Sequence, residues 1–251
     1  YVRGSVRSKN FETVIKEAKL LTQKGHKEIV LTGIHTGHYM DKDYDLTDLI
    51  NELSKIEDLL RIRISSIEIT ELNDKFLNML STNKKVCDHL HIPLQAGSDE
   101  ILKKMNRKYD LKYYEEKIKK IRMIRPDISI TTDIIVGFPY ETDELFNETL
   151  EFSRKMNFSK IHVFPYSIRL GTSAANMPNQ VDESIKKERV KKLMDLSEIT
   201  EKEYYNKFVG KELDILVEEC DNNVSIGHSS NYLMIRLNEK LEVGQIYKRI
   251  I

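Results

Sequence analysis

Five hydrophobic runs, separated by stretches of helical periodicity, constrain the fold of this chain more than any other feature. Each run is rich in Ile, Val and Leu and ends in polar or turn-forming residues. The runs, each with its ending, are 28–31 before 32–35, 60–64 before 65–68, 89–94 before 95–100, 128–136 before 137–139, and 161–164 before 165–167. Such continuous apolar runs are typical of parallel strands covered on both faces. Because (β/α) barrels place their chemistry at the carboxyl ends of the strands, the pattern predicts a catalytic rim at these endings.

Helical spacing of apolar residues fills the gaps between the runs. Helices are expected over residues 11–24, 47–56, 72–80, 98–105, 113–124 and 143–156. A complete barrel needs eight strands, whereas this part of the sequence provides five. We therefore expect an α/β fold in which residues 1–175 form a partial (β/α) barrel.

The pattern changes after residue 175. Residues 176–208 indicate a linker and a long charged helix from 182 to 206, with an inner face made of Ile185, Val190, Leu193, Leu196 and Ile199. Beyond them, short strands are expected at 212–218, 225–228, 232–237 and 245–251. Residues 209–251 are thus expected to form a small all-β domain. Since about 40 residues is near the lower limit for independent folding, this domain should lean on the barrel.

The composition excludes several classes of protein. The 251 residues include 40 Lys and Arg and 40 Asp and Glu, which excludes a uniformly positive surface. No apolar run approaches the roughly 20 residues of a membrane helix, and no signal peptide begins the sequence, so we expect a cytoplasmic protein without a membrane partner. Cys87 and Cys220 lie far apart, which indicates structural thiols rather than a disulfide framework or a metal knuckle.

Five motifs occur in order along the chain and carry a family resemblance. They are Thr-Gly-Ile-His-Thr-Gly at 32–37, Arg-Ile-Ser-Ser-Ile-Glu at 63–68, His-Ile-Pro-Leu-Gln-x-Gly-Ser-Asp at 91–99, Asp-Ile-Ile-Val-Gly-Phe-Pro at 133–139 and Tyr-Ser-x-Arg-x-Gly-Thr at 166–172. Together they resemble the radical S-adenosylmethionine methylthiotransferases. The resemblance implies a partial radical enzyme barrel followed by a TRAM-like β domain at 209–251.

The resemblance also implies a reaction and a partner. Residues 32–37 and 227–232 are most similar to the branch that inserts a methylthio group at C2 of N6-threonylcarbamoyladenosine beside the tRNA anticodon. Other branches act on isopentenyladenosine in tRNA or on an aspartate of a ribosomal protein. The implied partners are therefore the tRNA anticodon stem-loop and a reducing electron donor.

A binding site for S-adenosylmethionine follows from the same motifs. The methionine end of this cofactor needs acceptors for its ammonium and donors for its carboxylate. The implied contacts are Gly33, Ile34 and His35, then Ser65, Ser66 and Glu68, then Gln95, Ser98 and Asp133, and finally Gly137, Phe138 and Pro139 beside the adenine. Ser98 is also placed to cap the next helix. Singly such residues are more often structural, but their order at strand ends favours a site.

The sequence departs from the family pattern in its cysteines and at residue 140. The family holds a 4Fe-4S cluster with a Cys-x3-Cys-x2-Cys loop, whereas this sequence has two distant cysteines, which cannot hold a cluster with an open iron. We therefore expect this chain to be a piece of a longer parent with two such clusters, to hold none itself and to be inert alone; no catalytic residue is assigned. Tyr140 stands where many relatives have glycine.

RNA contacts are expected at two places. Arg3 and Arg7 lie near the amino end, and between residues 100 and 125 ten Lys or Arg face four acids. Such a strip neutralises phosphates, although a solvated helix face is the simpler interpretation of residues 112–125. In the β domain, His228, Asn231 and Tyr232 are the candidates for stacking on RNA.

Two other classes of function remain open. His89 and His91 lie two apart on a strand and, with Asp133, are compatible with a metal-dependent barrel hydrolase. No third histidine at a matching strand end supports that alternative. The other alternative is a non-catalytic RNA-binding protein.

Overall fold

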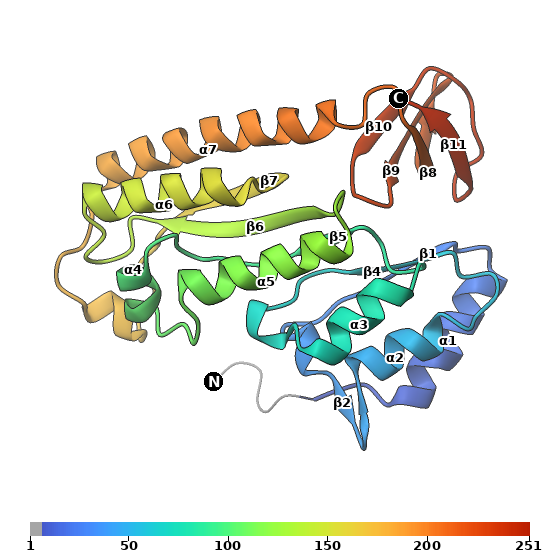
Figure 1. The fold of residues 1–251 in the computed structure, drawn as a ribbon, viewed down its shortest axis with the longest axis horizontal. Helices are drawn as coiled ribbons and strands as arrows, with labels where there is room; N and C mark the ends of the chain where they lie inside the picture. Colours follow the sequence, from blue (N-terminus) through green and yellow to red (C-terminus); the bar gives the residue numbers. More distant parts are fainter. Residues whose placement is uncertain (1–6) are drawn as a thin grey trace. The chain divides into compact units, whose positions relative to one another are not determined.

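The structure is a computed structural model that describes residues 7–251, so Arg3 lies outside the described residues (Figure 1). The chain divides into two compact units. The first combines the residues up to Leu90 with Gly210–Ile251, and the second is His91–Val209. These units differ from the predicted ranges 1–175, 176–208 and 209–251, because the carboxyl-terminal sheet packs within the first unit.

In the first unit, two of the hydrophobic runs form a parallel pair of strands. β1 (Glu28–Leu31) pairs with β4 (Arg61–Ile64), with Glu28 opposite Arg61. The helices of this unit are α1 (Phe11–Gln23), α2 (Leu46–Leu53) and α3 (Asp74–Thr82). Each begins where predicted within a few residues, because an Asn or Asp side chain at the N-cap accepts a backbone N–H of the first turn.

Short elements that the sequence pattern did not predict lie between β1 and α3. They are the 3₁₀ helix η1 (Thr36–His38), the hairpin of β2 (Met40–Asp41) and β3 (Tyr44–Asp45), and the 3₁₀ helix η2 (Ile69–Glu71). Strands of two residues are too short to show a periodicity. The two 3₁₀ helices follow the ends of β1 and β4, so they shape the predicted rim.

The last four strands form one antiparallel sheet in the order β10-β9-β8-β11. Their bounds are Glu212–Asp221 for β8, Val224–Ser229 for β9, Met234–Leu237 for β10 and Ile246–Ile250 for β11. Buried arginines of β4 hold this sheet. Arg61 donates to the backbone oxygens of Asp214 and His228, and Arg63 donates to those of Ser229 and Ser230.

In the second unit, three hydrophobic runs form a sheet in the order β5-β6-β7, in which β6 and β7 are parallel. Their bounds are His89–His91 for β5, Ser129–Val136 for β6 and Lys160–Pro165 for β7. The helices are α4 (Asp99–Lys104), α5 (Leu111–Ile124), α6 (Asp143–Met156), the 3₁₀ helix η3 (Ser173–Asn176) and α7 (Glu183–Asn206). Tyr114, Phe152 and Phe158 meet edge-on in its core.

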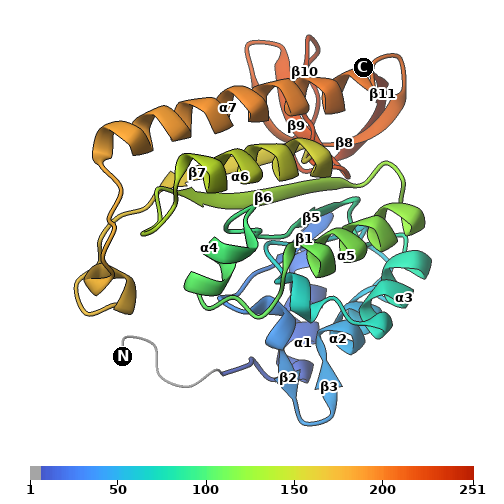
Figure 2. The same ribbon diagram turned by 60° about the vertical axis from the view of Figure 1, so that its left-hand side comes forward.

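Helix α7 runs along α6 and β7, as both ribbon views show (Figures 1 and 2). Its buried face is more polar than the sequence predicted. Leu193 and Leu196 are buried as expected, but Ile185 is 38% exposed and Ile199 is 55% exposed, so that part of the prediction is wrong. Ser197 is buried instead, because its hydroxyl accepts from the N–H of Ile161 at 2.9 Å and satisfies the backbone of β7.

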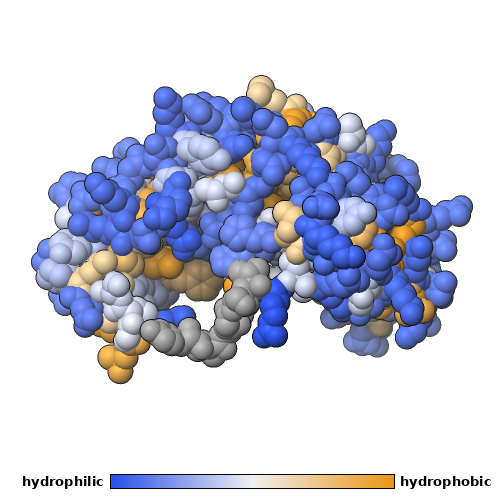
Figure 3. Space-filling view, turned by 90° about the horizontal axis from the view of Figure 1, so that it is seen from below, coloured by the Kyte–Doolittle hydropathy of each residue, from blue (hydrophilic) through white to orange (hydrophobic). Residues whose placement is uncertain are grey.

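None of the helices in the described part combines the length and the apolar character that a membrane span requires. Figure 3 shows a face on which hydrophilic side chains predominate and hydrophobic ones are scattered. Single exposed apolar side chains such as Leu170 are ordinary in folded proteins.

Candidate functional site

The turn after β1 borders a cavity of about 770 Å³ in the first unit. Thr32, Gly33, Ile34 and His35 line it together with Arg7, and apolar side chains of α1, α2 and β1 form most of the remaining wall. The volume is in the range of small-molecule sites. A Cβ added at Gly33 would meet its nearest neighbour, Thr36 Oγ1, at 3.5 Å, which is an ordinary contact, so the space at this turn does not itself require glycine.

Two hydroxyls at this cavity give a test of whether S-adenosylmethionine fits. Thr36 and Tyr39 both line the cavity. Thr36 Oγ1 and Tyr39 Oη are buried, and neither has a hydrogen-bond partner within the described residues. Buried hydroxyls normally have partners, so a polar ligand group would satisfy them. The cavity therefore fits the polar methionine end of the cofactor.

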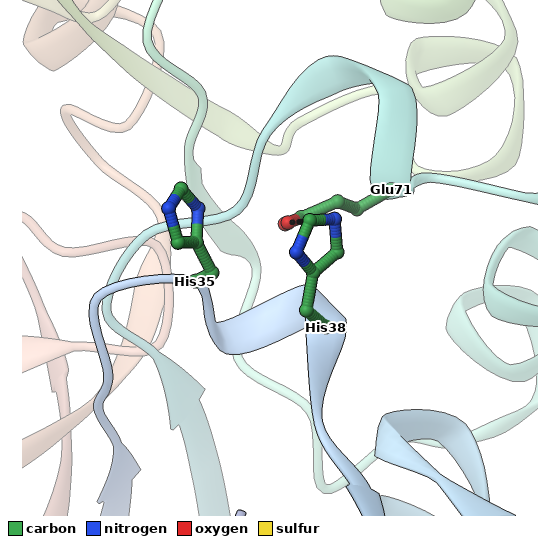
Figure 4. Close-up of side chains that lie close together, drawn as sticks. All are labelled: His35, His38 and Glu71. Carbon is green, nitrogen blue, oxygen red and sulfur yellow. Dashed lines mark ion pairs between the residues drawn. The ribbon is translucent and has the colours of Figure 1, made fainter. Parts of the chain in front are cut away.

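Beside the same turn, Glu71 lies close to two histidines (Figure 4). Its side chain is 3% exposed, and Glu71 Oε1 lies 3.4 Å from His38 Nε2. The rings of His35 and His38 stack at 5.3 Å. Gly37 makes the approach possible, because a Cβ at that position would overlap the Glu71 carboxylate. His35 thus belongs to a small polar cluster as well as to the cavity wall.

The end of β4 positions the second set of predicted contacts. Ser65 donates its N–H to the oxygen of Leu31 at 3.0 Å, which fixes it next to the end of β1. Ser65, Ser66 and Glu68 are partly buried, and Glu68 is the N-cap residue of η2. Their roles toward a cofactor remain predictions.

The remaining predicted contacts lie in the second unit. Gln95 has a φ of 70°, donates its N–H to the oxygen of Asp133 at 2.8 Å and accepts from the N–H of Ile135 at 2.9 Å. Ser98 is fully buried at the N-cap of α4, but its side chain makes no capping bond, so the predicted cap is wrong. Ser98 Oγ has no partner within the described residues.

The turn after β6 holds Gly137, Phe138, Pro139 and Tyr140. Gly137 and Tyr140 both have left-handed backbones, with φ of 72° and 73°. Phe138 is 7% exposed and packs edge-on against Tyr166 at 5.1 Å. Its ring is therefore part of an apolar cluster. Pro139 is buried as well.

A buried carboxylate holds this turn in place. Glu141 Oε1 accepts from the N–H of Gly137 at 2.7 Å and pairs with Arg189 of α7 at 2.9 Å. Burial raises the pKa of Glu141 above its ordinary value, although both partners oppose the rise. The turn is thus anchored to α7 by a buried ion pair.

Three strands of the second unit bring His91, Asp133 and His162 together. His91 Nε2 lies 3.3 Å from Asp133 Oδ2, and the rings of His91 and His162 are 5.7 Å apart. Burial, followed by the nearby His91, lowers the pKa of His162. Sequence reasoning missed His162, because it lies within a strand rather than at its end. The sequence does not specify that His162 lies opposite Asp133 in the pairing of β6 with β7.

His89 takes a different place from the one expected for a metal ligand. Its ring stacks on Tyr232 at 4.6 Å, and the ring of His228 stacks on the same tyrosine at 4.7 Å. Arg63 lies over that ring at 4.8 Å. Tyr232 is thus enclosed by three side chains of the first unit although 47% of it remains exposed.

The residues predicted to contact RNA are only partly available. Asn231 is 5% exposed, so it is not the exposed side chain that stacking on RNA requires. It is buried next to the Ser229 hydroxyl, from which its side-chain oxygen accepts a hydrogen bond. His228 Nδ1 lies 2.8 Å from Glu218 Oε2. In the basic strip, Lys119 pairs with Glu115, Arg122 donates to the oxygen of Asn157, and Arg7 is exposed.

The two cysteines do not fit an iron–sulfur cluster. Cys87 is 1% exposed, and burial raises the pKa of its thiol to about 12. Cys220 is partly buried in β8, and both thiols are free. A cluster needs several thiolates on one site, which the described residues do not offer.

Comparisons with known proteins agree with the sequence motifs. Residues 1–153 match the radical SAM superfamily. The chain is 44% identical to "Threonylcarbamoyladenosine tRNA methylthiotransferase MtaB" of Bacillus subtilis (strain 168), over 94% of this chain and 54% of that protein. It is 44% identical to "tRNA-2-methylthio-N(6)-dimethylallyladenosine synthase" of Thermoanaerobacter sp. (strain X514), over 87% of this chain and 47% of that protein. The chain thus spans about half the length of these relatives.

Solved structures support the fold. Coproporphyrinogen III oxidase (HemN) from Escherichia coli, a radical SAM enzyme, superposes with a TM-score of 0.59 at 17% identity, over 76% of this chain and 45% of that one. The radical S-adenosylmethionine methyltransferase TsrM from Kitasatospora setae gives 0.52 at 13% identity, over 62% and 31%. The chain therefore belongs to the radical SAM superfamily, and over most of its length it is a relative of the tRNA methylthiotransferases.

Proposed function

We propose that this chain is the cofactor-binding part of a tRNA methylthiotransferase that modifies C2 of N6-threonylcarbamoyladenosine beside the anticodon. The observation that carries the proposal is the cavity at the turn of residues 32–36, in a chain 44% identical to an enzyme named for that nucleoside. In this proposal, S-adenosylmethionine is the source of a reactive adenosyl group. A location in the cytoplasm, where tRNA is modified, follows from the same substrate.

The residues of the first unit have distinct tasks in this proposal. The Thr36 and Tyr39 hydroxyls bind the polar methionine end, and Gly33 lets the backbone approach it. Apolar side chains of α1 and α2 exclude water from the cavity. Ser65, Ser66 and Glu68 offer further acceptors and donors at the neighbouring strand end.

The second unit has its own contacts to offer. Ser98 has a buried hydroxyl without a partner among the described residues. The turn at Gly137 is buried and its N–H is bonded to Glu141, so a backbone oxygen of this turn is the group proposed to accept from the adenine amino group. The backbone N–H of Gln95 donates a hydrogen bond to the backbone oxygen of Asp133 at 2.8 Å. That these groups contact the nucleoside part of the cofactor is proposed from the resemblance of their sequence motifs alone.

In this proposal, the residues of this chain neither hold the iron–sulfur clusters nor supply electrons. The 4Fe-4S clusters belong to a longer parent protein in this proposal, the reducing electron donor is a separate partner, and this chain alone is proposed to be inactive. The carboxyl-terminal sheet is proposed to be a TRAM-like module that recruits tRNA. Lys103 and Lys108 of the basic strip, with Arg7, supply positive charge for phosphates.

A second substrate is favoured by a specific observation. The relative from Thermoanaerobacter matches as well, at 44% identity, and its name refers to dimethylallyladenosine. The two substrates differ in charge, because the threonylcarbamoyl group carries a carboxylate and the isopentenyl group does not. A ribosomal protein aspartate is the third candidate.

The cavity is tested by binding of S-adenosylmethionine to the 251-residue chain in isothermal titration calorimetry. We expect binding that Thr36→Val weakens roughly tenfold, since the variant removes one hydrogen bond to a charged group. Thr70→Val, at an exposed position of η2 outside the cavity, is the matched control and should bind like the parent chain. Unchanged affinity of Thr36→Val would contradict the placement of the cofactor.

The substrate is tested separately, by filter binding of anticodon stem-loops that carry threonylcarbamoyladenosine, isopentenyladenosine or unmodified adenosine. We expect the first to bind most tightly, and mass spectrometry should detect no 5′-deoxyadenosine from this chain alone with a chemical reductant. Preference for the isopentenyl stem-loop would assign the second substrate. Equal binding of all three would remove the substrate proposal while leaving the cofactor result intact.

A further inference from the structure

Three side chains on adjacent strands of the second unit have the composition of a metal site. His91 lies on β5, Asp133 on β6 and His162 on β7, and Asp133 and His162 are register partners. One nitrogen of each histidine and a carboxylate oxygen of Asp133 all lie within 4.8 Å of one another. Side chains on rigid strands hold a ligand set more accurately than side chains on loops.

The orientation of His91 is fixed in a way that suits metal binding. Its Nδ1 lies 2.9 Å from Thr131 Oγ1, on the strand that carries Asp133. If Nδ1 carries the proton and donates it to that hydroxyl, Nε2 presents a lone pair toward Asp133. Metal-binding histidines typically use one nitrogen for the metal and give the other to such an outer partner.

The spacing is also compatible with a bound ion. Metal–ligand distances of about 2.0–2.2 Å place two donors of a tetrahedral site about 3.4 Å apart. The distance of 3.3 Å between His91 Nε2 and Asp133 Oδ2 already matches this value. His162 is exposed, so its side chain is free to rotate toward the other two.

Charge and access complete the argument. The Asp133 carboxylate offsets part of a divalent charge, and the cation of Lys160, two residues before His162, is paired with Glu201 at 3.0 Å. The Asp133 side chain is 30% exposed. Three protein ligands with solvent access leave a coordination position for water or another ligand, as in catalytic rather than structural sites.

The other group with metal-binding side chains is less suited. His35, His38 and Glu71 lie on a turn and on 3₁₀ helices, and the His38 side chain is 58% exposed (Figure 4). No outer partner fixes either histidine ring among the hydrogen bonds of the described residues. This group therefore serves as a comparison in the experiment.

We propose that His91, Asp133 and His162 bind one divalent transition-metal ion and leave one coordination position open. Two imidazoles and one carboxylate favour Zn²⁺, Co²⁺, Ni²⁺ or Fe²⁺ over Mg²⁺ and Ca²⁺, which prefer oxygen ligands. Its ligands all belong to the second unit, and Asp133 is shared with the proposed cofactor contacts.

The test is titration of the metal-free 251-residue chain with Zn²⁺ in calorimetry and with Co²⁺ in visible absorption. We expect one tight ion per chain and a tetrahedral or five-coordinate Co²⁺ spectrum. His162→Ala should weaken binding a hundredfold or more by removing a ligand, and Thr131→Val by roughly tenfold by releasing the His91 ring. His26→Ala, at an exposed histidine outside both groups, is the matched control and should bind like the parent chain.

Circular dichroism of each variant separates loss of a ligand from loss of the fold, and His162→Gln serves where His162→Ala does not fold. The proposal is overturned if the folded parent chain binds no Zn²⁺. It is also overturned if His162→Ala keeps full affinity while His38→Ala loses it, since the ion would then lie at the other group.

Discussion

Tyr140 has a backbone conformation that is unfavourable for any residue with a Cβ. Its φ of 73° is in the left-handed region, which costs a residue with a Cβ about 1 kcal/mol relative to glycine. We predict that Tyr140→Gly is about 1 kcal/mol more stable than Tyr140→Ala. Both variants lose the ring beneath Lys104 Nζ at 3.8 Å, but only glycine removes the strain. Thermal unfolding of the two variants measures the difference.

The control for this comparison is Met123, which is 75% exposed on α5. There the order should reverse, with alanine about 1 kcal/mol more stable than glycine, because an ordinary helical backbone favours alanine. If alanine is the more stable residue at position 140 as well, the left-handed backbone at this turn is wrong.

Single residues also show how far the sequence could predict the site. Gly33 and Gln95 were predicted because turn residues after apolar runs mark strand ends, and the structure places them after β1 and β5, while their roles toward a cofactor stay predictions. His162 was not found, because a histidine inside a strand has no distinctive pattern. Its importance depends on register with Asp133, which the sequence does not specify.

At the scale of elements, the ion pair between Glu141 and Arg189 joins the turn after β6 to α7. Both side chains are buried, with Arg189 4% exposed. We predict that Arg189→Met lowers the free energy of unfolding by about 3 kcal/mol at neutral pH, because a buried carboxylate is left without its cation. Chemical denaturation of the variant and the parent chain measures this change.

The pH dependence of that variant has a definite sign. Burial already raises the pKa of Glu141 above its ordinary 4.5, and loss of Arg189 should raise it further. The folded variant then keeps a proton that the unfolded chain releases, so its stability falls as the pH rises from that ordinary value through the raised pKa. Arg189→Met combined with Glu141→Gln lacks the carboxyl and should lose this slope. An identical slope in both variants would assign it to another group.

The same element explains where the helix prediction failed. The bounds of α7 were predicted within one residue, because charge and apolar spacing continue from 182 to 206. Its buried face was only partly predicted. Arg189 and Ser197 face inward because partners outside this helix, remote in the sequence, satisfy them. Thr200 is also buried, and its hydroxyl donates to the backbone oxygen of Ser197 in the same helix.

For the whole molecule, the sequence predicted the order of elements better than their grouping. All five parallel strands and the four carboxyl-terminal strands occur where apolar runs predicted them. The sequence assigned residues 209–251 to a small β domain that leans on the barrel, and in the structure they share a compact unit with the residues up to Leu90. The cause is specific: Arg61 and Arg63 are 5% exposed and donate to backbone oxygens of the sheet. A sequence pattern of short strands does not predict which backbone oxygens accept hydrogen bonds from arginine side chains of another strand.

This grouping predicts how the chain responds to loss of residues 210–251. Without the sheet, Arg61 and Arg63 lose their backbone acceptors, and Arg63 keeps only Glu28, 2.6 Å away, as a partner. We therefore expect amide hydrogen exchange in β4 to accelerate roughly tenfold or more, equal to about 1.4 kcal/mol of local stability. Exchange in β6 of the second unit should not change, which also shows that the shortened chain folds. Unchanged protection of β4 would instead mean that the carboxyl-terminal sheet is a separate domain.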